Sequence, residues 1–455
     1  MAKKVLIIGS GAREHVIAET FMRSRHEVEI FVVGGAKNPG LSALAKDYLI
    51  ADVCDVAAIV EFARKCGVDF AVVGPEAPIA AGVVDGLLEA GFKSASPLAT
   101  VGRLESSKGF TRELLSKYGI AGNARFRSFD SEEGLKEFFE ELGDDFVVKA
   151  DGLKGGKGVK VSGDHLNGKA EGLEFALECL REDGRVVVEE KLIGQEFSLM
   201  SFCDGNFTCE MPAVQDHKRA FDGDKGGNTG GMGSYSDADH SLPFLRSSDV
   251  LEAAEITRNV AKALFEETGT EFKGVMYGGF MATKDGVKLI EYNARFGDPE
   301  VMNVLPLLKT DFVDVCEAII NGTLADLPLE FERKATVCKY LVPNGYPDDP
   351  VKGEKILVGG GEGAGADSKS VPGDKSIPVN AFRIYYASVD QREDGLYLCG
   401  SRAVNCVGIA DSISEAEKIA EEGACSISGP VFHRHDIGTA ELIEKRVKMM
   451  EGLRG

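Results

Sequence analysis

The stretch Leu289-Ile290-Glu291-Tyr292-Asn293-Ala294-Arg295-Phe296-Gly297-Asp298-Pro299-Glu300 is the point from which the rest of the chain is best interpreted. Residues 287–292 are mostly apolar and β-prone, so we predict a strand that runs into a tight loop. Side chains alternate between the faces of a strand, which places Glu291 and Asn293 on one side and Tyr292 on the other. A carboxylate and an amide oxygen at this spacing are hard ligands of the kind that Mg²⁺ takes together with phosphates. Taken alone, the pair is equally consistent with a solvated strand face.

The loop after this strand brings further charge within one turn. Arg295 and Asp298 are close enough in sequence to clamp a small zwitterion by charge-assisted hydrogen bonds. The sequence therefore predicts a metal–phosphate site beside a site for a small charged molecule.

Length and composition set the class of protein. The chain has 455 residues, which suggests about three domains, and an ordinary apolar fraction of 44%. Its formal net charge of −21 argues against a nucleic-acid or anionic-membrane surface, because such partners are met by basic patches. The ten cysteines show no CxxC pairing, which indicates reduced thiols rather than a disulfide framework or a zinc site.

The first residues and the hydropathy pattern predict the location. Met1-Ala2-Lys3-Lys4 leads straight into an apolar strand without the pattern of a signal peptide, and no apolar run is long enough to span a bilayer. We expect a cytoplasmic protein, a monomer or weak dimer, with no nucleic-acid or membrane partner.

Residues 4–91 alternate short β-runs with helical periods, which predicts βαβ units and a parallel sheet. The first turn, from Gly9 to His15, has the outline of a dinucleotide fingerprint. Its third position is Glu14 instead of glycine, and the second strand ends without a carboxylate for a ribose, so a nicotinamide-dependent oxidoreductase is disfavoured. Gly11 and Arg13 at a helix N-terminus still suit one phosphate monoester, although a plain tight turn remains an alternative. The Pro75-Glu76 turn should lie on the same sheet edge.

A middle block carries candidate nucleotide contacts. Lys108 opens a helix for which a serine is a suitable N-cap, and Lys149 lies on a strand. The next stretch, Gly155-Gly156-Lys157-Gly158, joins two β-runs and either covers a polyphosphate or forms an exposed hairpin tip. The segment 185–196 ends in acidic residues and suits an adenine edge with a ribose at Glu196, or is a hairpin with charged ends.

The second half of the chain contains one long glycine-rich segment, 222–233, which we predict to be a structureless substrate loop because Asp216, Lys218 and Arg219 precede it. Helices are expected at 243–267, 299–308 and 311–320, and antiparallel strands at 274–283 and 287–293. A strand-rich block begins near Phe331 and closes with an amphipathic helix from Ser412 and a charged C-terminal helix.

Seven motifs in this order resemble the phosphoribosylamine–glycine ligase family (glycinamide ribonucleotide synthetases), ATP-grasp enzymes of purine biosynthesis. The motifs are Gly9-Ser10-Gly11-Ala12-Arg13-Glu14-His15, Pro75-Glu76-Ala77-Pro78, Lys149-Ala150-Asp151-Gly152-Leu153, Gly156-Lys157-Gly158-Val159, Gln215-Asp216-His217-Lys218-Arg219, Asn228-Thr229-Gly230-Gly231-Met232-Gly233 and Arg295-Phe296-Gly297-Asp298-Pro299-Glu300.

The resemblance implies an α/β and α+β multidomain fold. It has an N-terminal parallel α/β domain over residues 1–104, an ATP-grasp domain over 105–329 with a small lid subdomain at about 125–192, and a C-terminal strand-rich domain over 330–455. It also implies Mg²⁺ or Mn²⁺ as cofactor and ATP, glycine and 5-phosphoribosylamine as substrates. Glycine would be joined to 5-phosphoribosylamine through a glycyl phosphate formed with ATP.

The resemblance also assigns residues to roles. Glu291 and Asn293 resemble the metal ligands, and Lys149, Arg295 and Asp298 are the candidate catalytic residues. The implied ATP contacts are Lys108, Lys149, Gly155, Gly156, Lys157, Gly158, Glu189, Lys191, Leu192 and Glu196. The implied substrate contacts are Gly11, Arg13, Glu14, Pro75, Glu76, Asp216, Lys218, Arg219, Arg295, Gly297 and Asp298.

The chain departs from the family pattern at Ala12, at Lys154 and Gly155, and at Arg383-Ile384-Tyr385-Tyr386 in the C-terminal block. The last departure leaves the C-terminal contribution to the site open. Other functions to be separated by experiment are another ATP-grasp carboxylate–amine ligase and a nucleotide-binding regulator that never turns ATP over.

Overall fold

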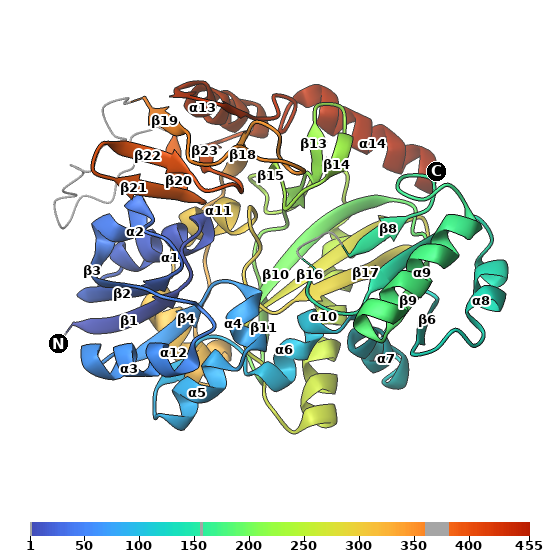
Figure 1. Ribbon diagram of the computed structural model, residues 1–455, viewed down its shortest axis with the longest axis horizontal. Coiled ribbons are helices and arrows are strands. Elements are labelled where there is room, and N and C mark those ends of the chain that lie inside the picture. Colours follow the sequence, from blue (N-terminus) through green and yellow to red (C-terminus); the bar gives the residue numbers. More distant parts are fainter. Residues whose placement is uncertain (1, 155–157, 360–381) are drawn as a thin grey trace.

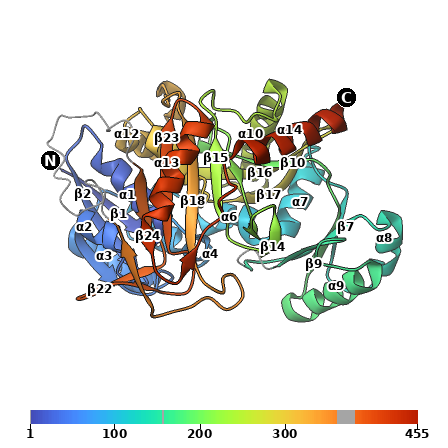
Figure 2. The same cartoon turned by 90° about the horizontal axis from the view of Figure 1, so that it is seen from above.

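The computed structural model of the protein describes residues 2–154, 158–359 and 382–455. Figure 1 shows a blue N-terminal region, a green-to-yellow middle region and an orange-to-red C-terminal region. The two ends of the chain lie on opposite sides of the molecule in both views (Figures 1 and 2). The predicted fold class, with a parallel α/β region followed by a mixed region and a strand-rich region, is confirmed.

The N-terminal region is built on a sheet of order β3-β2-β1-β4-β5, in which every strand is parallel to its neighbours. Helix α1 (Ala12–Met22) covers one face and helices α3 (Val56–Cys66) and α5 (Val83–Glu89) cover the other, so residues 5–8 are fully buried. The strands are β1 (Lys3–Ile8), β2 (Val28–Gly34), β3 (Ala45–Ile50), β4 (Phe70–Val73) and β5 (Lys93–Ser94). The βαβ units are confirmed; β3 and the short helices α2 (Pro39–Leu44), α4 (Glu76–Ala80) and α6 (Ala99–Ser106) are additions to the prediction.

The layer predicted to be a lid, called the lid below, is an antiparallel sheet of order β6-β9-β7-β8, backed by helices α8 (Leu135–Leu142) and α9 (Lys169–Asp183). Its strands are β6 (Phe126–Phe129), β7 (Phe146–Ala150), β8 (Val159–Val161) and β9 (Val186–Glu190). The predicted pairing of the two β-runs around the glycine–lysine loop is confirmed by the β7–β8 register. Helix α9 approaches the sheet closely at Gly172, where a Cβ would lie 2.4 Å from the Phe146 ring. In Figure 2 this layer occupies the end of the molecule away from the N-terminal sheet.

The central layer is a second antiparallel sheet, of order β11-β10-β16-β17, packed against α7 (Lys108–Lys117), α10 (Ser247–Thr268) and α12 (Phe312–Asn321). Its strands are β10 (Gln195–Asp204), β11 (Thr208–Glu210), β16 (Lys273–Thr283) and β17 (Gly286–Asn293). The predicted β16–β17 pairing is confirmed, as is the serine cap of α7, where the Ser107 side chain accepts a bond of 3.1 Å from the Phe110 amide.

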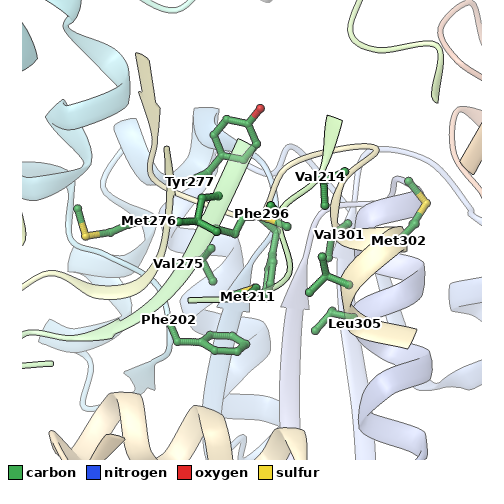
Figure 3. Packing of buried hydrophobic residues seen from close by; sticks show 14 of the residues in the cluster. Phe202, Met211, Val214, Val275, Met276, Tyr277, Phe296, Val301, Met302 and Leu305 are labelled. Atoms are coloured by element: carbon green, nitrogen blue, oxygen red, sulfur yellow. The ribbon is translucent and has the colours of Figure 1, made fainter. Parts of the chain in front are cut away.

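The loop after β17 is anchored to the hydrophobic core by Phe296. Figure 3 shows Phe296 among the apolar side chains of β10, β16 and the following helix, including Phe202, Val275 and Val301. The rings of Phe202 and Phe296 meet edge to face with centroids 6.0 Å apart. Because Phe296 is buried, the charged residues on either side of it are held at fixed positions above the core.

The C-terminal region combines strands from distant parts of the chain into one sheet, of order β12-β15-β18-β23-β20, with β25 paired to β18. The strands are β12 (Gln215–Asp216), β15 (Gly233–Ser236), β18 (Ala335–Pro343), β20 (Arg383–Tyr386), β23 (Val404–Ala410) and β25 (Val431–Phe432). A smaller sheet contains β19 (Lys355–Val358), β21 (Val389–Arg392), β22 (Gly395–Leu398) and β24 (Ile427–Ser428). The helix predicted after Ser412 is α13 (Ile413–Cys425), and the chain ends in α14 (Ala440–Arg454).

Three predicted segments differ from the structure. The prediction of a structureless loop over 222–233 is wrong, because β13 (Arg219–Phe221) and β14 (Lys225–Asn228) form a hairpin; Gly223 and Asp224 have φ of 74° and 60°, the left-handed geometry of a tight turn. Helix α10 begins at Ser247 instead of 243, and 299–308 contains only α11 (Val301–Val304) and a 3₁₀ turn, Leu305–Leu307, that includes a proline.

None of the helices in the described ranges combines the length and the apolar character that crossing a bilayer requires.

Candidate active site

Strand β17 presents the two predicted metal ligands on one face. Glu291 lies opposite Gly279 and Asn293 lies opposite Tyr277 in the antiparallel register with β16. Both polar side chains are partly exposed, whereas Tyr292 between them is 2% exposed. The alternation predicted from the sequence is therefore confirmed.

Four cations surround the Glu291 carboxylate. Burial acts to raise the pKa of Glu291, but the charges of Lys218, Lys149, Lys108 and Arg295 outweigh it and lower the pKa. Among the described residues, none makes a hydrogen bond or an ion pair with this carboxylate. Glu291 is thus an ionised group whose oxygens are free to bind a cation, within a basic environment suited to phosphates.

Lys149 is held in place by a buried triad that it forms with Glu189 and Arg112. Glu189 accepts bonds of 2.7 and 2.8 Å from the Arg112 guanidinium, and its second oxygen lies 2.8 Å from Lys149 Nζ. Burial would raise the pKa of Glu189, but Arg112 and Lys149 lower it to about 2. Lys149 Nζ also donates to the Ile290 carbonyl at 2.9 Å, and Arg112 donates to the Leu289 and Ile290 carbonyls at 3.0 Å. The triad joins the lid strands to the strand that carries Glu291.

The Glu189 side chain, which the resemblance placed at the adenine hinge, is therefore fully engaged by Arg112 and Lys149. Its main chain is also paired on both sides, with Phe126 and with Val147. Among the described residues, the amide of Leu192 just beyond the strand takes part in no hydrogen bond.

The other predicted nucleotide contacts lie along the lid. Lys108 Nζ donates to the Gly152 carbonyl at 2.8 Å, and Lys191 Nζ donates to the Ser162 carbonyl at 2.7 Å. Gly158 is packed against Lys154, where a Cβ would lie 2.8 Å from the Lys154 side chain. The predictions for Gly155, Gly156 and Lys157 fall outside the described residues.

Arg295 is held between carboxylates from the N-terminal region. Its guanidinium lies 3.3 Å from Glu76 Oε2 and 2.9 Å from Glu105 Oε1, and it donates to Asn293 Oδ1 at 3.3 Å. Burial opposes its charge, but Glu105 and Glu76 raise the pKa of Arg295. Glu105 also accepts a bond of 2.8 Å from the Ala294 amide. Arg295 is therefore a positioned cation next to the strand that carries the predicted metal ligands.

The pKa values of Glu105 and Glu76, the two carboxylates beside Arg295, are shifted in opposite directions. Burial raises the pKa of Glu105, because this residue is more deeply buried than its partner. Burial also acts to raise the pKa of Glu76, but Arg295 and Arg13 lower it. Glu76 follows Pro75 at the start of α4, so both predicted residues lie at the carboxyl edge of the parallel sheet, as expected.

Asp298 is bound by the C-terminal region. Its Oδ1 accepts a bond of 2.6 Å from the Tyr340 hydroxyl and lies 3.2 Å from the Arg402 guanidinium. Arg402 also donates to the carbonyls of Asp298 at 2.9 Å and Gly230 at 2.6 Å, and its guanidinium stacks 4.4 Å from the Tyr340 ring. A pocket of about 260 Å³ opens beside Arg402, and its other lining residues are Asn228, Thr229, Gly230, Tyr346, Pro347, Gly400 and Ser401.

Asp216 and Glu300 form a second pair of acidic residues, close to the loop after β17. Burial, with the charge of Glu300, raises the pKa of Asp216 well above its ordinary value, and burial also raises the pKa of Glu300. Glu300 accepts a bond of 2.8 Å from the Tyr277 hydroxyl. Gly297 allows this arrangement, since a Cβ there would lie 2.5 Å from Glu300 Oε2 and 2.7 Å from the Tyr277 ring.

Lys218 connects this acidic pair to Glu196, one of the predicted nucleotide contacts. Its Nζ lies 3.0 Å from Glu196 Oε2, and the charge of Glu196, followed by those of Glu291 and Asp216, raises the pKa of Lys218 although burial opposes it. Arg219, the next predicted residue, donates to the Gly226 carbonyl within its own hairpin at 3.0 Å. Arg219 therefore holds the hairpin, while Lys218 points toward the predicted site.

The turn at the start of α1 is filled by its own glutamate. The Gly11 amide donates to Glu14 Oε2 at 2.6 Å, and the Arg13 guanidinium lies 2.7 Å from Glu14 Oε1 and donates to the Phe296 carbonyl at 3.3 Å. Glu14 thus occupies the anion position at the helix N-terminus that the sequence suggested for a phosphate.

We predict that Gly74→Ala destabilises the protein by about 1–3 kcal/mol, because the new Cβ would lie 1.8 Å from Glu14 Oε1. Glu14 is 2% exposed and cannot move away without losing its bonds to Gly11 and Arg13. Urea unfolding measures the effect, with Gly35→Ala as the matched control, since nothing lies within 4 Å of a Cβ at that position. Equal midpoints for the two variants would contradict the prediction.

The divergent C-terminal stretch contacts α1. The Tyr386 amide donates to His15 Nδ1 at 3.1 Å, and the two rings stack with centroids 5.8 Å apart. The Arg383 guanidinium lies 3.0 Å from Glu19 Oε1. The stretch therefore supports the first turn of the N-terminal region from the side of the C-terminal sheet.

The structure brings the predicted residues of β17, its loop, the lid and strand β12 into one neighbourhood, linked by the charges around Glu291. Sequence reasoning missed Glu105, Arg112 and Arg402, which hold Arg295, Glu189 and Asp298 respectively. No sequence motif marks any of the three, because each is a single charged residue whose partner is distant in the chain.

Comparison with known proteins places the whole chain in one family. Models of the N domain, the ATP-grasp (A) domain and the C domain of phosphoribosylglycinamide synthetase match residues 3–105, 106–301 and 336–440. Phosphoribosylamine–glycine ligase of Methanocella arvoryzae is 46% identical over 99% of this chain and all of its own length. The enzyme of that name from Methanosarcina acetivorans is 47% identical over all of this chain and 99% of its own.

A solved structure agrees with these matches. The crystal structure of phosphoribosylamine–glycine ligase from Thermotoga maritima superposes with a TM-score of 0.75 at 29% identity, covering 95% of this chain and 99% of that one. The fold of this chain is thus that of a solved structure of this name. The chain belongs to the phosphoribosylamine–glycine ligase family, the phosphoribosylglycinamide synthetases, whose central domain has the ATP-grasp fold.

Proposed function

We propose that this chain joins glycine to 5-phosphoribosylamine at the expense of ATP, giving glycinamide ribonucleotide, ADP and phosphate, a step of purine biosynthesis. Membership in the family supports the reaction. The observation in the structure that carries the proposal is the ionised Glu291 carboxylate, free of hydrogen bonds among the described residues and surrounded by Lys218, Lys149, Lys108 and Arg295.

At the nucleotide end, Glu291 and Asn293 would hold Mg²⁺ or Mn²⁺, which when bound neutralises charge on the transferring phosphoryl group. Their carboxylate and amide oxygens on one strand face fit such an ion. Lys108 and Lys149 add positive charge around the phosphates, and the triad with Glu189 positions Lys149. The adenine edge would meet the main chain at Leu192, and the ribose would meet Glu196.

At the substrate end, the Arg295 guanidinium supplies a fixed positive charge for the glycine carboxylate, next to the metal site. The rest of the glycine site would be formed by Gly297, Asp298, Asp216 and Lys218. The other face, toward phosphoribosylamine, would consist of Gly11, Arg13, Glu14, Pro75 and Glu76, while Arg219 contributes by holding the β13–β14 hairpin. Among these, Glu14 acts by ordering the first turn, since its carboxylate is engaged by the Gly11 amide and by Arg13.

The reaction passes through a glycyl phosphate. A carboxylate is a poor acyl donor, so glycine is activated first. The γ-phosphoryl group of ATP moves to a glycine carboxylate oxygen, and ADP is the leaving group. The amine of phosphoribosylamine then attacks the carbonyl carbon, and phosphate leaves with that oxygen. Holding the amine beside the acyl phosphate lowers the barrier by up to about 7–11 kcal/mol in favourable cases, and no protein nucleophile is required.

An assay of ADP release tests this function. We expect ADP only when glycine, phosphoribosylamine and a divalent cation are all present, and no comparable release with other acid and amine pairs. Glycine labelled with oxygen-18 in its carboxylate should transfer one label to the released phosphate. ADP formed with a different acid–amine pair would assign the chain to another ligation, and ATP binding without turnover would identify a regulator. Unlabelled phosphate would exclude the acyl phosphate.

A further inference from the structure

We propose that the chain carries a second metal site, for a divalent transition-metal ion of the zinc class, on the outer face of the C-terminal region. Three ligands are Glu421 on α13 and His433 and His435 in the segment after β25, whose ligand atoms lie within 4.8 Å of one another. Cys425 on α13, whose sulfur lies 3.6 Å from Glu421 Oε1, would turn inward as the fourth. This site shares no residue with the proposed ligase site and would bind its ion whether or not that function is correct.

The ligand atoms already converge. His433 Nε2 lies 3.2 Å from both carboxylate oxygens of Glu421, and His435 Nδ1 lies 2.6 Å from Oε1. Cys425 Sγ lies 3.6 Å from the same oxygen. Ligand atoms around a tetrahedral zinc ion with its usual bond lengths are about 3.3–3.6 Å apart. To admit an ion, the His435–Glu421 hydrogen bond must lengthen and the Cys425 side chain must turn toward the histidines.

Both histidines of the segment after β25 reach toward α13. Arg434, between them, points the other way: it lies 2.8 Å from Asp436 and 3.2 Å from Asp224, and it donates to the Arg219 carbonyl at 3.0 Å. Arg434 is 1% exposed, so this anchor is buried. The buried Arg434 side chain therefore anchors the segment, while His433 and His435 on either side of it both contact Glu421 on α13.

The helix supplies its two ligands from one face. Glu421 and Cys425 are four residues apart, so their side chains lie one turn apart on the same side. Helix α13 is packed tightly on β23, where a Cβ at Gly408 would lie 1.9 Å from the Ala416 carbonyl. The two halves of the site are therefore each held by a buried contact, as a preformed metal site requires.

The charges favour a divalent cation. Lys339 Nζ, fully buried, lies 2.7 Å from Glu417 and 2.6 Å from Glu421 and donates to the His435 carbonyl at 2.9 Å. Its single positive charge leaves one carboxylate charge uncompensated. Cys425, which donates to Glu421 as a thiol, would add a second negative charge on losing its proton as an ion binds. A divalent ion would neutralise this excess, and Lys339 would orient the ligating carboxylate from behind.

Nitrogen and sulfur ligands set the ion class. Two imidazoles, a thiolate and one carboxylate suit Zn²⁺ or Co²⁺ and not the Mg²⁺ or Mn²⁺ expected at Glu291. The lack of CxxC motifs does not exclude such a site, because it uses a single cysteine together with ligands from two separate elements. A second cluster, His26 with Asp311 and Asp314, offers one nitrogen only, and its carboxylates are engaged by Ser24 and Arg25.

Cobalt spectroscopy on the full chain, stripped with a chelator and kept free of nucleotide, tests the proposal. We expect about one Co²⁺ per chain with the visible bands of tetrahedral cobalt and a near-ultraviolet thiolate charge-transfer band, both abolished by Zn²⁺. Cys425→Ser should remove the thiolate band. His435→Ala should weaken binding by at least about tenfold; its side chain is 63% exposed, so the fold should tolerate the change.

His26→Ala and Cys399→Ser are the matched controls, because they remove a comparable histidine beside carboxylates and another exposed thiol. Both should retain the wild-type spectrum. The proposal is overturned if wild-type protein shows no tetrahedral cobalt bands, or if His435→Ala and Cys425→Ser bind and absorb as the controls do. In that case the cluster is only a hydrogen-bonded partner for Lys339.

Discussion

Replacing Glu291 with glutamine should lower kcat for ATP-dependent glycine ligation by at least about a hundredfold while the chain stays folded. Glutamine keeps the shape of the side chain and removes the negative charge that four neighbouring cations hold in its ionised form. The variant loses a metal ligand, so the Mg²⁺ concentration needed for half-maximal rate should also rise. Steady-state kinetics across a Mg²⁺ titration measure both effects, and circular dichroism verifies folding.

Asp285→Asn is the matched control for this change. Asp285 is an exposed acidic residue in the turn that joins β16 to β17, so the substitution removes the same charge from the same hairpin far from the ligand face. Its kinetics should equal those of the wild type. Near-normal turnover and an unchanged Mg²⁺ titration in Glu291→Gln would remove the metal assignment.

Replacing Arg112 with methionine should reduce the free energy of unfolding by about 3–5 kcal/mol, the cost of breaking a buried ion pair by removing one partner. Arg112 and Glu189 are 2% and 3% exposed, and their two hydrogen bonds of 2.7 and 2.8 Å would be lost together with the donors to the Leu289 and Ile290 carbonyls. Urea unfolding measures the loss. Activity should fall as well, because Lys149 loses its rigid partner.

The dependence of the free energy of unfolding on pH in the acid range provides a second test of Arg112→Met. The pKa of Glu189 is about 2 in the folded protein, below its unfolded value of about 4.3. The stabilisation from this depressed pKa is fully present above the unfolded value and is lost as pH falls toward 2. Without Arg112 this dependence should be shallower between those pH values.

Lys117→Met serves as the control for Arg112→Met, since it breaks an exposed ion pair with Glu267 and should leave the unfolding midpoint almost unchanged. If both variants unfold at the same urea concentration, Lys149 alone satisfies Glu189 and the triad is not what holds the lid to β17.

The local pattern of the chain was enough to predict much of the fold. The alternation of Glu291, Tyr292 and Asn293, the βαβ order of residues 4–91 and the lid hairpin all follow from side-chain periodicity between neighbours in sequence, and the structure agrees. The prediction that the expected substrate loop over 222–233 is structureless is wrong, because its glycines do not exclude regular structure and two left-handed residues are what a tight hairpin needs.

The sequence by itself determined which residue types meet at the end of β17, because that order is local. Tertiary structure alone decided which charges hold them: Arg112 and Glu189 are 77 residues apart, Arg402 and Asp298 are 104 apart, and Glu105 reaches Ala294 across 189 residues. A buried charge must find a partner, but packing chooses which one, and no spacing rule along the chain encodes that choice.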